Sequence, residues 1–497
     1  MSLDTNNLAY NDPLAKLGTW VTGRVEKWED HRNTNYLDKW DEYYRIWRGI
    51  WKSEDKTRHS EKSQLISPAS QQAIESIVSE LEEAVFGGSK WFDLRDDVID
   101  QDPRDVAAIR MFLQEDLEKE KVKDAVVESL LNAAIYGTGI AKVNVIERTE
   151  KVVKVAPIEG TYTSDTVVSE QDIVAVKVEA LSPKEFVIDP TATSIDEALG
   201  CAQIVIKAKY EIMEGIRDGL YEDKPIGSYN KIDLGFDEED SSVSTDDDKV
   251  KITEYWGRVP KKFLNKSDDL SDEFDYDEDE LVEAVVTIAN DKVVLRASEN
   301  PYLMKDRPFI SFQLDRVPNK FWGRGVTEKG YNPQKALDAE LRARIDTLAL
   351  TTHPMMGVDA TRLPRGVKFE VKAGKTILTN GDPRQSLMPL NFGSLSQSSF
   401  TEAAELERMV QMGTGAMDSA TSNSGNPRNA TASGMSMIQA ASIKRQKRTI
   451  MNFSENFLIP MIQKASWRYI QFAPERYPAG DYKFIAHSTM GIMAKEL

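Results

Sequence analysis

One segment of the chain has residue types that bind nucleotide phosphates. Ala373-Gly374-Lys375-Thr376 has the ending of a phosphate-binding loop, in which a lysine and a hydroxyl hold the phosphates. That loop also needs a glycine five places before Gly374, and Phe369 occupies this position. The chain therefore lacks the glycine-rich backbone that surrounds phosphates, and we do not expect ATP binding here.

Two further patterns resemble ligand sites in part. Gly137-Thr138-Gly139 follows a helical pattern, whereas a dinucleotide fingerprint needs a strand before its glycines, so it indicates a helix end. Asp275, Asp277 and Asp279 have the spacing of a calcium loop, but Glu280 replaces the required glycine. Loose cation binding stays open, and an EF-hand is excluded.

The histidines are too scattered for a metal or catalytic site. They are His31, His59, His353 and His487, with no H-E-x-x-H pair and a single cysteine, Cys201. No G-x-S-x-G motif occurs, and paired carboxylates cannot be selected from 81 acidic residues without a fold. We therefore expect no catalytic residue, cofactor or metal. An enzyme with an unrecognised acidic site remains an alternative.

Composition limits the class of protein. The 497 residues exceed one usual hydrophobic core, and 40% hydrophobic content suffices for several subdomains. A net charge of −18 argues against a protein that grips nucleic acid over its whole surface. We expect Cys201 to be buried in a strand. A single cysteine cannot form an internal disulfide, so the chain suits a reducing compartment. No signal peptide or membrane-spanning run is predicted.

The elements that would position any site are helices first and strands later. Aromatic residues at helical spacing predict a helix over residues 14–51, with the aromatic side chains as packing anchors. Ser67-Pro68 and Gly87-Gly88 predict the ends of a second helix. Its expected buried residues are Ile74, Ile77, Val78, Leu81 and Val85. A third helix is predicted over residues 103–136.

The strands predict an α+β fold. They are expected at residues 141–147, 152–157, 173–179, 201–208, 250–259, 281–288, 292–297, 308–314, 367–371 and 376–379, with a short helix at 210–220. The acidic runs 237–248 and 268–280 are expected to be solvated loops.

The clearest helix is residues 326–350. Its apolar stripe is Leu337, Leu341, Ile345 and Leu348, and its opposite polar face is Gln334, Asp338, Arg342 and Asp346. That polar face is either a solvated surface or faces a cavity or partner. Beyond it we expect a helix at 400–412, a Gly/Ser/Asn-rich loop at 413–429 and a helix at 431–471 kinked at Pro460.

Five short segments, in this order, carry a family resemblance. They are 47–51 (WRGIW), 132–139 (NAAIYGTG), 186–190 (FVIDP), 321–325 (FWGRG) and 428–434 (RNATASG). Together with the order of the elements, they make the chain similar to the portal (head-to-tail connector) proteins of tailed bacteriophages. The resemblance implies a multi-domain α+β subunit with wing, stem, clip and crown regions and long helices. Such subunits assemble into a ring with a central channel.

The resemblance also implies domain boundaries. They are 1–209, N-terminal helices and α/β wing; 210–249, first stem segment and acidic loop; 250–318, β-rich clip; 319–352, second stem helix; 353–399, strands returning to the wing; 400–430, helix and channel loop; and 431–497, crown helix and C-terminal tail. The first stem helix is the weakest assignment, because residues 210–220 are short and contain two glycines.

By the same resemblance, the chain would form the channel at one capsid vertex through which the double-stranded genome is packaged and ejected. Its partners would be further copies in a dodecamer, passing DNA without sequence preference, the terminase motor, the major capsid or scaffolding protein and tail adaptor proteins, but no membrane. It would assemble in the host cytoplasm and reside in the virion. A head-tail adaptor or scaffold without a channel is the alternative. Candidate channel-lining residues are Arg342, Arg344, Asn423, Asn426, Arg428 and Asn429.

Overall fold

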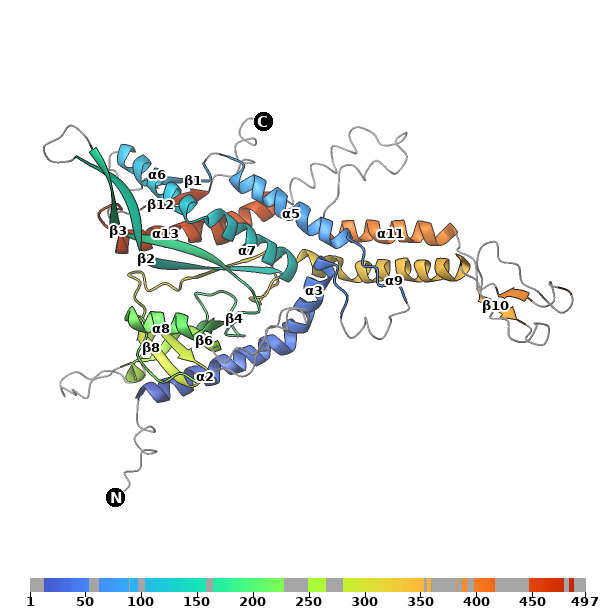
Figure 1. The fold of residues 1–497 in the computed structure, drawn as a ribbon, viewed down its shortest axis with the longest axis horizontal. Helices are drawn as coiled ribbons and strands as arrows, with labels where there is room; N and C mark the ends of the chain where they lie inside the picture. The colour runs from blue at the N-terminus through green and yellow to red at the C-terminus, as the bar shows by residue number, and fades with distance from the viewer. Residues whose placement is uncertain are drawn as a thin grey trace, which may run out of the picture. The chain divides into compact units, whose positions relative to one another are not determined.

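The computed structural model describes residues 13–52, 62–88, 90–96, 103–157, 164–227, 249–264, 280–352, 355–358, 382, 387–390, 397–415, 447–477 and 482–486. The chain divides into two units: unit 1 comprises residues 1–44, 73–328 and 416–497, and unit 2 comprises residues 45–72 and 329–415. Helices and antiparallel sheets are both present (Figure 1), which confirms the predicted mixture of α and β structure.

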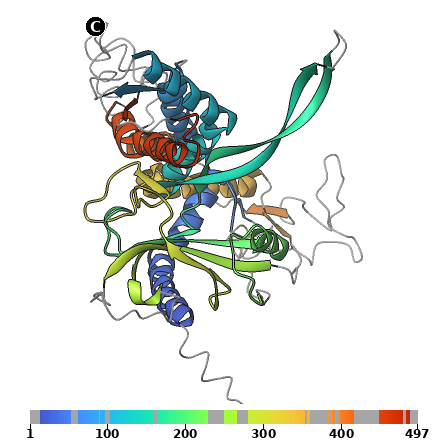
Figure 2. The ribbon, with the colours of Figure 1, turned by 90° about the vertical axis from the view of Figure 1, so that its left-hand side faces the viewer.

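Unit 1 begins with a long helical segment. It consists of α2 (Pro13–Arg32), a π-helical turn η1 (Asn33–Leu37) and α3 (Asp38–Arg48). The prediction of a helix here is confirmed. Leu17, Val21, Val25 and Trp28 recur at three- and four-residue steps and are buried against a five-stranded sheet (Figure 2). Trp28 is thus a core residue, as expected.

The five-stranded sheet is antiparallel and joins distant parts of the sequence. Its strands are β4 (Phe186–Ile188), β5 (Gly200–Ala208), β6 (Lys249–Pro260), β7 (Leu281–Ala289) and β8 (Val293–Glu299), in that order. The predicted strands from residue 201 to 297 are confirmed, and β4 is additional. Cys201 is fully buried in β5, as predicted. A turn of 3-10 helix, η2 (Lys261–Phe263), follows β6, and α8 (Lys209–Arg217) follows β5.

The second sheet has the order β3-β2-β9 and contains a long hairpin. Its strands are β2 (Thr138–Pro157), β3 (Ser164–Leu181) and β9 (Phe309–Gln313). The expectation of separate strands at 141–147 and 152–157 is wrong, because residues 148–151 keep their cross-strand pairs with β3. Residues 250–314 are therefore rich in strands as expected, but their strands belong to two different sheets.

The helices that cover this sheet differ from prediction at one point. Residues 103–136 form two helices, α6 (Pro103–Lys119) and α7 (Val122–Tyr136), instead of one. Lys121 adopts a left-handed conformation with φ 54° between them, although no glycine or proline marks the break. The preceding helix α5 (Ala69–Phe86) begins and ends close to the predicted signals, and four of its five predicted core residues are buried.

The C-terminal part of unit 1 packs on the same sheet. Residues 447–453 are helical, followed by a π-helical turn η5 (Ser454–Leu458) and α13 (Ile459–Phe472). Pro460 lies in the first turn of α13, directly after the π-helical turn, and residues 431–446 of the predicted helix lie outside the described residues. Arg468 on α13 makes two 2.8 Å contacts with the Asp306 carboxylate. Strand β12 (Tyr482–Ala486) pairs with β1 (Phe92–Asp96), a pairing that the sequence did not indicate.

Unit 2 contains two long helices and a small strand pair. Helix α9 (Val326–Thr352) and helix α11 (Gln397–Thr414) lie side by side in Figure 1, and between them in sequence β10 (Met355–Val358) pairs with β11 (Leu387–Leu390). The predicted strands 367–371 and 376–379 lie outside the described residues, as does the loop 413–429 beyond residue 415.

Candidate functional site

Helix α9 presents two different faces within unit 2. Leu337 on the apolar stripe is 2% exposed and belongs to a small core with Ala403 and Val410 of α11. Ile345 and Leu348, further along the same stripe, are 41% and 50% exposed. The first half of the stripe is thus used inside unit 2, and the second half is open on the described surface.

The polar face of α9 binds the segment that precedes α5. Asp338 Oδ1 accepts from the Ser67 backbone N–H at 2.8 Å, and Asp346 Oδ1 accepts from the Ser63 N–H at 2.8 Å. Gln334 is fully buried, and its Nε2 donates to the Ser67 carbonyl at 3.0 Å. The interpretation of this face as a solvated surface is therefore wrong for Gln334 and Asp338, because both pair with the backbone.

Burial changes the acidity of this contact. Desolvation raises the pKa of Asp338 above its usual value, although the Ser67 N–H, Arg342 and Gln334 act in the opposite direction. The Gln334 amide also donates to Asp338 Oδ1 at 2.9 Å. This cluster fixes residues 63–70 along α9, because the backbone of Ser63 and Ser67 is hydrogen-bonded to side chains of that helix.

Helix α11 runs antiparallel to α9. Arg344 Nη2 donates to the Ser399 carbonyl at 2.6 Å, and its guanidinium lies over the Phe400 ring at 4.4 Å. At the other end of the pair, a Cβ at Gly413 would lie 3.0 Å from the Lys329 carbonyl oxygen. Early residues of α9 therefore meet late residues of α11, and glycine permits the close approach.

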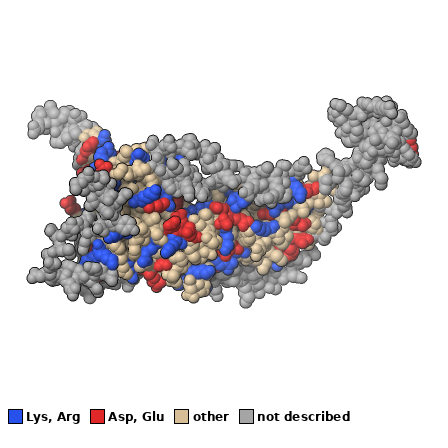
Figure 3. Space-filling view, turned by 90° about the horizontal axis from the view of Figure 1, so that it is seen from below, with Lys and Arg blue, Asp and Glu red and all other residues tan. Residues whose placement is uncertain are grey.

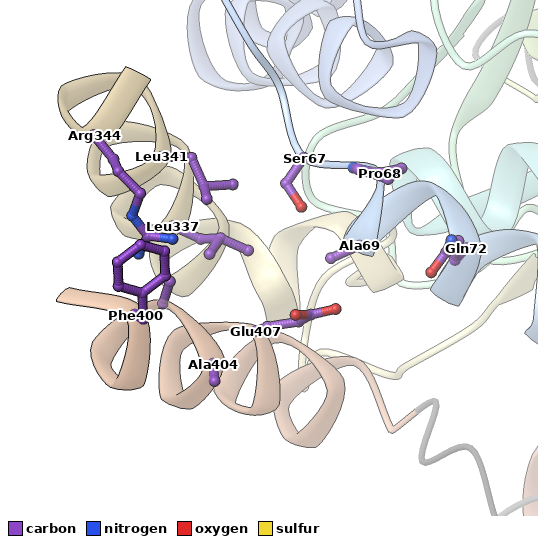
Figure 4. A pocket seen from close by; sticks show the side chains of 11 residues that line it. Ser67, Pro68, Ala69, Gln72, Leu337, Leu341, Arg344, Phe400, Ala404 and Glu407 are labelled. Atoms are coloured by element: carbon purple, nitrogen blue, oxygen red, sulfur yellow. The ribbon is translucent and has the colours of Figure 1, made fainter. Parts of the chain in front are cut away.

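A pocket lies between the two helices and the 67–72 segment (Figure 4). Its volume is about 320 Å³. It is lined by Ser67, Pro68, Ala69, Gln72, Leu337, Leu341, Arg344, Phe400, Ala403, Ala404 and Glu407. Seven of these residues are apolar, but polar atoms form the larger part of the exposed lining, which includes one cation and one carboxylate and contains no histidine or cysteine.

The structure places the predicted channel residues as follows. The Arg342 guanidinium lies 4.5 Å from the centre of the Trp51 ring, and Arg344 holds α11 as described above. Both are on α9, and both have a partner within unit 2. Asn423, Asn426, Arg428 and Asn429 lie outside the described residues.

A contact between Gly137 and Gly323, which the sequence did not indicate, joins the end of α7 to the segment before α9 in unit 1. Gly137 ends α7 with φ 101°, and a Cβ there would lie 2.2 Å from the Gly323 carbonyl oxygen. The Gly323 N–H donates to Thr138 Oγ1 at 2.8 Å. Phe321 packs near Phe186, with ring centres 5.9 Å apart. Three of the five resemblance segments therefore meet in one place, which their short-range signals could not show.

The described residues add little that is reactive. Burial raises the pKa of the Cys201 thiol to about 12, so the thiolate is disfavoured. Among these residues we find no cluster of three or more potential metal ligands. None of the helices in the described part of the chain has the length and apolarity needed to cross a membrane.

Comparison with known proteins gives one family. The family model described as phage SU10 portal protein matches residues 115–476, well over half of the chain. None of the curated proteins matches.

Proposed function

Because the chain belongs to the phage SU10 portal protein family, we propose that its copies form a ring, of twelve subunits by resemblance, around a channel for double-stranded DNA at one capsid vertex. Portal proteins of this family are structural, non-enzymatic components of the virion. The genome would be packaged and later ejected through the channel. The family match over residues 115–476 is the observation that carries the proposal.

The paired helices of unit 2 support a structural role. Helices α9 and α11 are joined by an apolar core and by the Arg344 contacts, and α9 is also hydrogen-bonded to residues 63–70. Apolar side chains remain exposed on both helices, including Leu348 at 50% and Phe400 at 54%. A cyclic assembly needs two different patches on every subunit, and such side chains supply contact area.

The charge distribution supports loose contact with DNA. The chain carries −18, and basic and acidic side chains are interspersed on the face shown in Figure 3. Tight non-specific binding needs dense lysine and arginine that release counterions from the phosphates. A passing duplex would therefore be guided without being held.

We propose a change in the region names. Residues 250–318 were expected to form the clip, but β6, β7 and β8 share a sheet with β4 and β5 of the expected wing. Helices α9 and α11 instead flank residues 353–396, which include β10 and β11. The resemblance to portal proteins implies that stem helices flank the clip. This arrangement therefore supports α9 and α11 as the stem and residues 353–396 as the clip.

Partners and DNA contacts follow from the family as proposals. The ring would dock the terminase motor, then tail adaptor proteins, and would sit in a shell of major capsid or scaffolding protein. DNA would meet the 413–429 loop, with Asn423, Asn426, Arg428 and Asn429, and the cations Arg342 and Arg344. Arg342 is the cleaner test of a DNA contact, because Arg344 also holds the helix pair together.

Imaging tests the proposal directly. Negative-stain images and native mass spectrometry of the purified full chain should show a closed ring with a central hole. A small oligomer without a hole, or an adaptor-like plate, would contradict it. Shortening the 413–429 loop should leave the ring intact and impair packaging or retention of DNA. Rings that lose their shape after this change would show that the loop is structural.

A further inference from the structure

The hairpin of β2 and β3 is longer than the sheet it belongs to. Strand β9 pairs with β2 only over Thr138–Lys142, whereas β3 stays paired with β2 out to Pro157 and Ser164. Figures 1 and 2 show this ribbon extending beyond the other elements of unit 1. We call residues 151–157 and 164–170 the arm.

The base of the hairpin is held by neighbouring helices. Glu150 accepts from Lys119 at 2.8 Å, and Arg148 pairs with Glu120 at 2.6 Å, next to the break between α6 and α7. In the arm the structure describes the side chains of Lys151, Val168 and Glu170, and these three form no hydrogen bond or ion pair with another element. The one ion pair there, Lys151 with Glu170 at 4.0 Å, lies within the arm.

The outer edges of β4, β8 and β9 in the two larger sheets are capped by basic side chains. Side chains donate to edge carbonyls in three places: Arg32 to Phe186 of β4 at 3.3 Å, Lys224 to Val294 of β8 at 2.9 Å, and Lys464 to Phe309 of β9 at 3.0 Å. Proteins protect exposed strand edges in this way because open edges pair with other chains. The outer edges of β4, β8 and β9 thus carry such contacts, and none is seen at Lys151, Val168 or Glu170, the arm residues whose side chains the structure describes.

The composition of the arm favours an apolar protein contact. It contains five valines, at positions 152, 153, 155, 167 and 168, and Val168 is 58% exposed. Its two lysines, Lys151 and Lys154, balance Asp165 and Glu170, so its formal charge is zero. A two-stranded ribbon with no further contact is only marginally stable in water, so a packing partner would stabilise it. Because its net charge is zero, it lacks the excess positive charge that attracts DNA phosphates.

Resting on the proposed ring, we propose that the arm is an intersubunit element that lies against the neighbouring copy of this chain. At about 3.3 Å per residue, residues 151–157 reach about 23 Å beyond Glu150. Copies with a charge of −18 repel one another, so a contact element without net charge is the part best able to cross between them. A ring also needs a projecting patch that differs from its receiving patch.

The first test shortens the hairpin without disturbing its base. Glu150 and Gln171 are register partners, so an Asn-Gly turn in place of residues 151–170 would close the hairpin there. Circular dichroism and the melting temperature of the monomer should be unchanged. In a dilution series followed by mass photometry, rings should require at least tenfold more subunit than the wild type.

The second test keeps the full hairpin and changes one cross-strand pair of side chains. Val153 and Val168 are register partners, and the double variant Val153→Lys/Val168→Glu replaces them with an ion pair. The matched control, Lys151→Glu/Glu170→Lys, reverses the neighbouring pair and keeps the valines. Ring assembly should weaken in the first variant by at least fivefold and stay within twofold of wild type in the control.

The outcomes separate two failures. If the wild type itself forms no ring, the proposed function fails. If the wild type forms rings and both arm variants form them at the same concentration, the arm does not join subunits, and the proposed function stands. Equal loss in the valine variant and its control would also overturn the proposal, because it would show an effect of charge placement alone.

Discussion

At the residue scale, Lys464 shows how unit 1 buries an amine. Its Nζ donates to the carbonyls of Arg307 at 2.5 Å and Phe309 at 3.0 Å, and lies 3.8 Å from the Asp306 carboxylate. Burial lowers the pKa of Lys464 below its usual value of 10.5, although Asp306 acts in the opposite direction. The two carbonyls and the Asp306 carboxylate give the three donors of a charged amine acceptors inside the unit.

The Lys464 contact predicts a pH dependence. In the window between its lowered folded pKa and 10.5, the unfolded chain binds more protons at this site, so stability rises with pH. The free energy of unfolding of the wild type should therefore rise, relative to Lys464→Met, as the pH increases from neutral toward 10.5. Urea unfolding at several pH values measures the difference.

Lys447→Met, at an exposed position, serves as the control and should show no such trend. A difference between wild type and Lys464→Met that stays flat, or falls with pH, would contradict the assignment.

The role of a single residue could be predicted where the backbone conformation requires one residue type. Gly137 was expected to end a helix, and its φ of 101° explains why glycine is there. The sequence predicted that Gln334 and Asp338 lie on the polar face of a helix. It did not predict their hydrogen-bond partners, which lie more than 260 residues away in sequence. Periodicity gives the face of a helix and not what covers it.

At the element scale, the glycine contact predicts a large asymmetry between two substitutions. Gly137→Ala would place a Cβ 2.2 Å from the Gly323 carbonyl oxygen at a left-handed φ, so we expect a loss of about 2–4 kcal/mol. Gly23→Ala on α2 meets nothing within 4 Å and should be neutral or stabilising by about 0.5–1 kcal/mol. Chemical denaturation of both variants tests this; equal effects would show that the contact is not tight.

Elements were predicted well where local pattern decides them. The strands β5 to β8 and helix α9 follow periodicity in the sequence. Strand β2 was divided wrongly because residues 148–151 lack apolar side chains, whereas pairing with β3 and the ion pairs to Lys119 and Glu120 keep them extended. The break at Lys121 was missed because no residue type announces it.

At the scale of the whole molecule, net charge opposes assembly. Copies that each carry −18 repel, and salt screens that repulsion over about 8–10 Å at moderate ionic strength. The subunit concentration needed for rings should therefore fall as NaCl rises from about 20 to 300 mM. Mass photometry across this range checks it. Rings that fall apart on adding salt would mean that ion pairs, instead of apolar contacts, hold the subunits together.

The family was predictable at this scale, and the sheet arrangement was not. Five short segments in order were enough to suggest a portal protein, and the family match agrees. The pairing of β5 with β6 joins residues on either side of a long acidic insertion, so the boundary expected at residue 250 passes through one sheet. Strand order depends on such long-range pairing, which local pattern does not contain.

The π-helical turn η1 affects how the N-terminal helix tolerates a change in length. Trp28 stacks on Tyr255 and Trp40 packs on Trp322, so both must keep their orientation. Deleting one residue from a regular helix turns everything beyond it by about 100°. Asn33–Leu37 already contains the surplus residue of a π turn, so a deletion there would restore ordinary α-helix and leave both indole rings pointing as they do now.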